Sequence, residues 1–103
     1  MPYIKVSGLT KEKICEVSDD LIEIVSKVTK TDKQKIRVFY NPMLEILDSK
    51  VCENRLNIDI DWMPRSQKMC DKVANEFKEY FKNYNFEIIK VYFTEFVKEK
   101  YYI

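Results

Sequence analysis

Pro2, directly after the first methionine, is the residue with the clearest chemical potential, and it opens an alternating segment that runs from Tyr3 to Ser7. Removal of Met1 would leave a secondary amine here, and an unperturbed α-amino group has a pKa of roughly 7.7–8.0. Apolar, partly desolvated surroundings lower that pKa because they disfavour the charged form. Such an amine takes up and returns protons near neutral pH, as a general base does. The alternative is structural, since a proline opening an edge strand loses nothing through its missing N–H.

Other polar side chains lie on predicted strands. Asp59 and Asp61 are two residues apart, which places both carboxylates on one face. Such a pair is typical of acid–base or metal chemistry, but we expect a solvated polar face. Arg37, taken by itself, is most often a surface or interface ion-pair partner on a strand. Trp62 is expected to anchor the core or an interface.

Composition excludes several kinds of site. The chain has no histidine, and its three cysteines lack metal-ligand spacing, so a zinc site and a histidine-based triad or dyad are excluded. We expect no metal and no cofactor. Cys15 and Cys70 fall near the apolar faces of helical patterns and are expected to be buried or half-buried.

Charge and hydropathy narrow the choice of partners. Lysine and arginine total 18 and aspartate and glutamate 17, which gives no electrostatic reason to expect nucleic acid or an anionic membrane surface. No signal peptide and no apolar run near 18 residues is found. We therefore expect a reduced, cytoplasmic protein without nucleic-acid or membrane partners.

The elements that position Pro2 follow from periodicity. Tyr3–Ser7 is predicted as a strand, with Gly8 giving the freedom for the turn that follows. Thr10 is a plausible N-cap for an amphipathic helix that continues to about Lys30. A second strand is expected over Lys35–Asn41, where Arg37 and Phe39 share one face. Strand, helix and returning strand form a right-handed β-α-β unit with parallel strands.

The second half repeats this plan. Residues 43–47 and 51–53 indicate a small hairpin arm around Asp48-Ser49-Lys50. A strand over 56–62, a helix capped by Ser66 and a strand over 88–94 then follow. The two halves are offset by about 52–55 residues, which indicates an internal structural repeat.

The predicted architecture is therefore α+β. One domain, residues 1–103, holds pseudo-repeats at 1–42 and 56–95, a hairpin arm at 43–55 and an apolar docking tail at 96–103. Two β-α-β units side by side give a four-stranded mixed sheet with two helices on one face. We expect the other face to be apolar and therefore to be covered by oligomerisation.

With these features the chain resembles the tautomerase superfamily, which includes 4-oxalocrotonate tautomerase and macrophage migration inhibitory factor. The resemblance rests on the Met-Pro start, the duplicated plan, the length, the segment Ile36-Arg37-Val38 and the segment Val91-Tyr92-Phe93-Thr94. The first and last of these are most similar to a functionally uncharacterised bacterial branch.

The resemblance implies a homotrimer with active sites between subunits and the processed Pro2 as general base toward a small keto or enol acid. Arg37 matches an arginine that binds the substrate carboxylate from a neighbouring subunit, which suits a planar, bidentate guanidinium. Tyr92 falls where cytokine-like members place a tyrosine beside the proline. Arg65 is a further candidate for substrate charge.

Two departures qualify the resemblance. Leu9 replaces a second arginine of the small tautomerases, which argues against their dicarboxylate substrate. Thr31 stands, within one position, where cytokine-like members have a lysine. The sequence thus supports a cofactor-independent tautomerase or isomerase, and alternatively a non-catalytic trimeric binding or structural module that kept the fold. A Pro2 nucleophile in a dehalogenase- or hydratase-like reaction ranks last, because no acid for water activation is evident.

Overall fold

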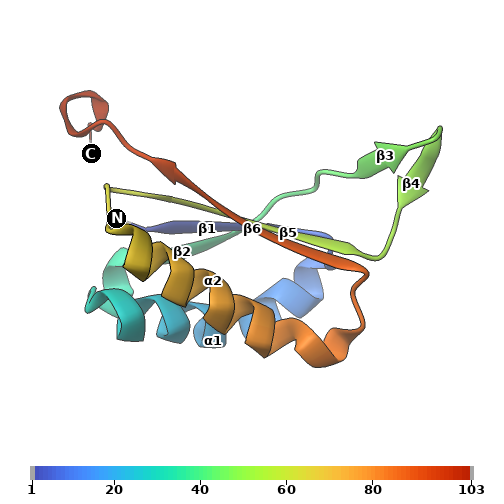
Figure 1. Ribbon diagram of the computed structural model, residues 1–103, viewed down its shortest axis with the longest axis horizontal. Coiled ribbons are helices and arrows are strands. Elements are labelled where there is room, and N and C mark those ends of the chain that lie inside the picture. Colours follow the sequence, from blue (N-terminus) through green and yellow to red (C-terminus); the bar gives the residue numbers. More distant parts are fainter. Residues whose placement is uncertain (1, 103) are drawn as a thin grey trace.

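The computed structural model describes residues 2–102 and shows a sheet whose one face is covered by two helices (Figure 1). The sheet has the strand order β2-β1-β5-β6. Its strands are β1 (Tyr3–Ser7), β2 (Arg37–Tyr40), β5 (Arg55–Trp62) and β6 (Ile88–Glu95), and the helices are α1 (Lys11–Thr29) and α2 (Gln67–Phe81). A separate two-stranded hairpin comprises β3 (Glu45–Leu47) and β4 (Lys50–Cys52). Three short 3₁₀ turns complete the order: η1 (Lys33–Lys35), η2 (Lys82–Tyr84) and η3 (Lys98–Lys100).

The pairing directions confirm the predicted mixed sheet of two β-α-β units. β1 pairs in parallel with β2, and β5 pairs in parallel with β6. The two units join through the antiparallel pair β1 and β5, in which Tyr3 lies opposite Asp61 and Ser7 opposite Asn57. The α+β class, the two helices on one face and the hairpin are as predicted.

Both helices begin at the predicted caps. The Thr10 hydroxyl oxygen accepts a hydrogen bond from the backbone N–H of Lys13 at 3.1 Å, and that of Ser66 accepts from Met69 at 3.2 Å. Each bond satisfies an N–H that has no partner within the helix. α1 ends at Thr29, and its C-cap Lys30 has a left-handed φ of 60° that turns the chain toward η1.

The hydrophobic core lies between the sheet and the helices. Trp62 belongs to it, as expected, and stacks on Phe93 with ring centroids 4.8 Å apart. The buried apolar residues are Ile4, Val6, Ile14, Val17, Leu21, Val25, Ile36, Leu56, Ile58, Ile60, Trp62, Val73, Phe77 and Phe81. On the strands they alternate with polar residues, which is the period-two pattern of a sheet with one buried face.

Gly8 occupies a position that no other residue fits. Its φ is +103°, and a Cβ built there would stand 2.2 Å from the carbonyl oxygen of Arg55. The glycine therefore allows both the turn after β1 and the close approach of β5.

The prediction of an apolar second face is wrong. The face away from the helices carries Lys5, Asp59, Asp61 and Tyr92, and the Lys5 ammonium contacts Asp61 at 2.6 Å. Because side chains alternate along a strand, the residues that place aliphatic groups in the core leave polar groups opposite. The two carboxylates are also less solvated than expected, since Asp61 is only 8% exposed.

Two smaller predictions are also corrected. Cys15 is exposed rather than buried, because it lies outside the buried stripe of α1, whereas Cys70 is half-buried. The second strand starts at Arg37 rather than Lys35, because Asp32 accepts a bond from the N–H of Gln34 and holds residues 33–35 in a 3₁₀ turn.

The hairpin extends away from the sheet at the end opposite the start of β1 (Figure 1). Asp48 and Ser49 have φ values of 54° and 62°, which is the geometry of a two-residue type I′ turn. Its apolar side chains are largely exposed: Met43, Leu44, Ile46, Leu47 and Val51.

The tail after β6 packs in part on its own chain. The backbone N–H of Phe96 donates to the carbonyl of Trp62 at 2.8 Å, and the hydroxyls of Tyr101 and Tyr3 are 2.7 Å apart. Tyr102 remains 88% exposed. Within residues 2–102, no helix has the length and apolar character needed to cross a bilayer.

Candidate functional site

Pro2 is buried at the end of the sheet where β1 starts and β5 finishes. Its carbonyl accepts a hydrogen bond from the backbone N–H of Arg37 at 3.1 Å, which continues the β1–β2 pairing by one step. The antiparallel register pairs Tyr3 with Asp61, so the next residue on each strand is Pro2 and Trp62. Met1, whose removal would free the Pro2 nitrogen, lies outside the described residues.

Arg65 joins this end of the sheet from the loop between β5 and α2. Its guanidinium lies over the Trp62 ring, 5.5 Å from the centroid, and its Nη2 reaches the Thr31 hydroxyl at 3.4 Å. The Thr31 hydroxyl is held in turn by that of Thr29 at 2.8 Å. A cation therefore stands beside the position where the resemblance expects a lysine.

Two buried donors at this site have no hydrogen-bond partner. They are Nε1 of Trp62 and Nε of Arg65. The sequence predicts only a packing role for Trp62, in the core or at an interface. A tryptophan at the last position of a strand, three residues before an arginine, is the signal from which a paired role could have been suspected.

Arg37 lies on the other face of the sheet from the core, in register with Tyr3. It is exposed, and its Nη1 donates to the carbonyls of Gln34 and Ile36, the latter at 3.0 Å. In a single chain this guanidinium thus caps the turn before β2.

Tyr92 lies further along the sheet from Pro2. It pairs with Asp59, which in turn pairs with Lys5, three residues beyond Pro2 on β1. Partial burial, and then the charges of Asp59 and Asp61, raise the pKa of Tyr92. The hydroxyl therefore stays protonated at neutral pH and can donate a hydrogen bond. One chain brings Pro2 and Arg65 to the same end of the sheet, but it does not bring Tyr92 there.

The carboxylates on the open face influence each other. Burial, and then the neighbouring charge of Asp61, raises the pKa of Asp59. The hydrogen bond to Asp61 raises the pKa of Lys5. The cluster is a pair of neighbouring carboxylates with one counter-ion, Lys5, and no group of three or more His, Cys, Asp or Glu side chains in residues 2–102 could hold a metal ion.

A cavity lies at the opposite end of the sheet from Pro2. It has a volume of about 480 Å³ and is enclosed by the hairpin, the turn after β1 and the end of β2, with Leu9, Tyr40, Met43, Val51 and Arg55 among its lining residues. Its walls include none of the four residues singled out from the sequence. We therefore place the candidate site at Pro2, because of the chemistry of the residues there, and not at this cavity.

Solved structures with this fold define the class of protein. Over 98% of this chain and 90% of that one, the fold matches Pt0534 inactivated by 2-oxo-3-pentynoate, with a TM-score of 0.78 and 13% identity. A macrophage migration inhibitory factor-like protein from Entamoeba histolytica matches with a TM-score of 0.74 and 15% identity, over 99% of this chain and 92% of that one. The chain thus has the fold of the tautomerase superfamily.

The family follows from the sequence. The model of the domain of unknown function DUF1904 matches residues 1–103, and the chain belongs to that family. A DUF1904 structure from Sebaldella termitidis is similar, with a TM-score of 0.91 and 24% identity over 100% of this chain and 95% of that one. No curated protein matches the chain.

Proposed function

We propose that this protein is a cofactor-independent tautomerase or isomerase that acts on a small keto or enol acid, with Pro2 as general base once Met1 has been removed. The observation that carries the proposal is the burial of Pro2 at the start of β1, beside Trp62 and at the end of the sheet where Arg65 lies. The fold provides the setting in which such a proline is expected to act.

The surroundings favour a neutral amine. Apolar neighbours disfavour the ammonium form, and a guanidinium on the same side of the sheet disfavours it further. The neutral nitrogen would take a proton from the carbon next to the keto group, and the electron pair of the C–H bond would become the enol double bond. Return of the proton from the ammonium to the other end of the conjugated system completes the isomerisation, so no oxidant or reductant is consumed.

A 2-oxo acid with one carboxylate is the substrate class that we favour. Arg65 supplies a cation suited to a carboxylate. Leu9, which replaces the second arginine, packs against the core and offers no second charge contact. The inactivation of Pt0534 by 2-oxo-3-pentynoate, itself a 2-oxo acid, supports this class by similarity of fold.

We further propose a homotrimer in which a neighbouring subunit supplies Arg37 and Tyr92 to the Pro2 site. Within one chain Tyr92 stands away from Pro2 and Arg37 is exposed, so both are available to a neighbour. The exposed apolar hairpin, together with Val97 and Tyr102 of the docking tail 96–103, is the surface that such an assembly would cover. Chain 1–103 would then act as a single domain.

The first test combines mass and activity on one sample. Intact-mass spectrometry of untagged protein from a host that processes Met-Pro starts should show loss of Met1. The same sample should interconvert the enol and keto forms of phenylpyruvate, and Pro2→Ala should reduce the rate by about 10²-fold or more, the scale of a general base. Lys68→Ala, an exposed change on α2, is the control.

Two results would contradict the proposal. One is a retained Met1, because an acylated proline nitrogen is not a base. The other is processed protein that is inactive toward several 2-oxo acids. Either result would favour the alternative of a trimeric binding or structural module. The guanidinium of Arg37 supports this alternative, because it already donates to the backbone carbonyls of Gln34 and Ile36.

A further inference from the structure

Two unpartnered donors lie at the Pro2 end of the sheet. Four buried side-chain atoms in residues 2–102 lack a hydrogen-bond partner: Nε1 of Trp62 and Nε of Arg65 at this end, and Oγ of Ser7 and Nε of Arg55 at the other. These two belong to side chains that pack on each other, with the guanidinium carbon 5.5 Å from the ring centroid. A buried donor without an acceptor destabilises the fold, so two neighbouring ones indicate an acceptor that arrives with a ligand.

The position of the indole argues against a packing accident. The Trp62 ring is fully buried and stacked on Phe93 at an interplanar angle of 19°, which a phenylalanine could reproduce without introducing a polar atom. Arg65 lies over this ring, is half-buried, and contacts the Thr31 hydroxyl at 3.4 Å.

We infer that Trp62 and Arg65 form a two-donor carboxylate site, in which the indole N–H and the guanidinium bind the carboxylate of the 2-oxo acid. This inference rests on the proposed function and specifies its substrate-binding residues. Both donors are N–H groups and one carries a charge, so they match the two oxygens of a carboxylate. Pro2 directly precedes Tyr3, and Trp62 directly follows the Asp61 that pairs with Tyr3, so the carbon chain of the bound acid would extend toward the proline nitrogen.

Trp62 is the only tryptophan in the chain, so its indole N–H gives one unambiguous NMR signal. The experiment titrates ¹⁵N-labelled Pro2→Ala protein, which cannot turn the ligand over, with 2-oxobutanoate. We expect the indole proton signal to move downfield with saturation. Butanone, which has the same keto group and no carboxylate, should leave it in place.

Two variants separate the hydrogen bond from the Trp62 N–H from the packing of its ring. Trp62→Phe keeps an aromatic ring and removes the N–H, and it should weaken 2-oxobutanoate binding by about tenfold or more, as expected for a lost hydrogen bond to a charged group. Phe93→Leu disturbs the stack from the other side and retains the N–H, so it is the matched control and should bind within about threefold of the parent. Calorimetric titration measures both, and melting temperatures confirm that both fold.

The outcomes of these experiments test the two-donor site separately from the proposed function. If wild type isomerises phenylpyruvate while the indole signal ignores 2-oxobutanoate, or Trp62→Phe binds as well as the parent, the two-donor site is wrong and the proposed function stands. If wild type neither isomerises nor binds any 2-oxo acid, the proposed function fails and the two-donor site fails with it.

Discussion

Two carboxylates on β5, two residues apart, have opposite effects on stability. The pKa of Asp59 is raised by burial and by the charge of Asp61, so the folded state binds this proton more tightly than the unfolded state does. Stability from Asp59 is therefore present at low pH and lost as pH rises from the ordinary aspartate range through the raised pKa. Asp61, by contrast, is paired with Lys5 at 2.6 Å.

We predict that Asp59→Asn raises the free energy of unfolding at pH 7 and leaves it little changed at pH 3, since the neutral amide removes a charge that folding disfavours. Asp61→Asn should lower the free energy at pH 7 by about 1 kcal/mol, because it breaks an ion pair on a partly solvated face. Urea unfolding at both pH values and at fixed protein concentration measures each effect. Equal shifts of the same sign in the two variants would contradict this account.

The role of Pro2 was only partly predictable from the sequence. Its type and position suggested a base, but its burial, and its place opposite the end of β5, came from pairing. Arg65 was a candidate for substrate charge from the sequence, but its contacts with Trp62 and Thr31 are known only from the fold.

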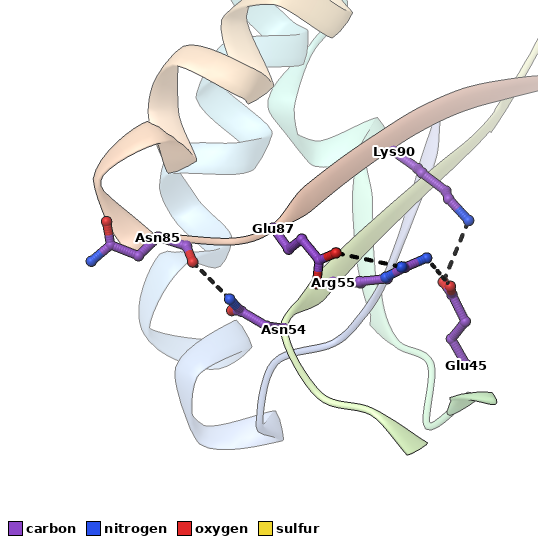
Figure 2. Close-up of polar contacts among 6 residues, drawn as sticks. All are labelled: Glu45, Asn54, Arg55, Asn85, Glu87 and Lys90. Carbon is purple, nitrogen blue, oxygen red and sulfur yellow. Dashed lines mark hydrogen bonds and ion pairs between the residues drawn. The ribbon is translucent and has the colours of Figure 1, made fainter. Parts of the chain in front are cut away.

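At the scale of elements, a network of ion pairs ties the hairpin to the sheet (Figure 2). Arg55 at the start of β5 donates to Glu45 of β3 at 2.6 Å and lies 3.6 Å from Glu87, and Lys90 of β6 contacts Glu45 at 3.4 Å. Partial burial opposes ionisation of Glu45, but Lys90 and Arg55 outweigh it and hold its pKa below the ordinary value. Glu45 therefore joins the hairpin to both β5 and β6.

Glu45→Gln should loosen the hairpin without unfolding the sheet. We expect backbone amides of residues 45–52 to exchange with deuterium several-fold faster, because the neutral amide no longer holds both cations. Amides of β1 and β5 should be unaffected. Glu53→Gln, an exposed change next to β4, is the matched control. Unchanged exchange in the hairpin of Glu45→Gln would show that hairpin orientation does not depend on this network.

At the scale of the whole molecule, the exposed apolar hairpin requires an explanation. Ile46 is 65% exposed and Leu44 is 70% exposed on an arm that extends from the sheet. Such surface on a short two-stranded ribbon is unstable in water unless a partner covers it.

Ile46→Asp should reduce the assembled state to monomers at micromolar concentration, since a charge buried at a subunit contact is costly. Light scattering coupled to size-exclusion chromatography measures the mass. Asn75→Asp adds the same charge to an exposed position on α2 and should leave the mass unchanged. A wild type that is monomeric at high concentration would contradict the proposed trimer.

The sequence by itself determined the elements of this protein. Apolar residues at three- and four-residue steps, alternating aliphatics and the caps Thr10 and Ser66 located the helices and strands, because these signals are local. The duplicated β-α-β plan then allowed few arrangements of the sheet. The polar character of the open face could also have been read from the alternation around Asp59 and Asp61.

Only the tertiary structure decided which side chains share an environment. The register of β1 against β5 places Pro2 beside Trp62, and a shift by one residue would have placed it beside a carboxylate. The contact between Arg65 and Trp62 and the exposed stripe that contains Cys15 depend on how helices and loops pack. These are long-range consequences of one core shared by the whole chain, and local periodicity contains no information about them.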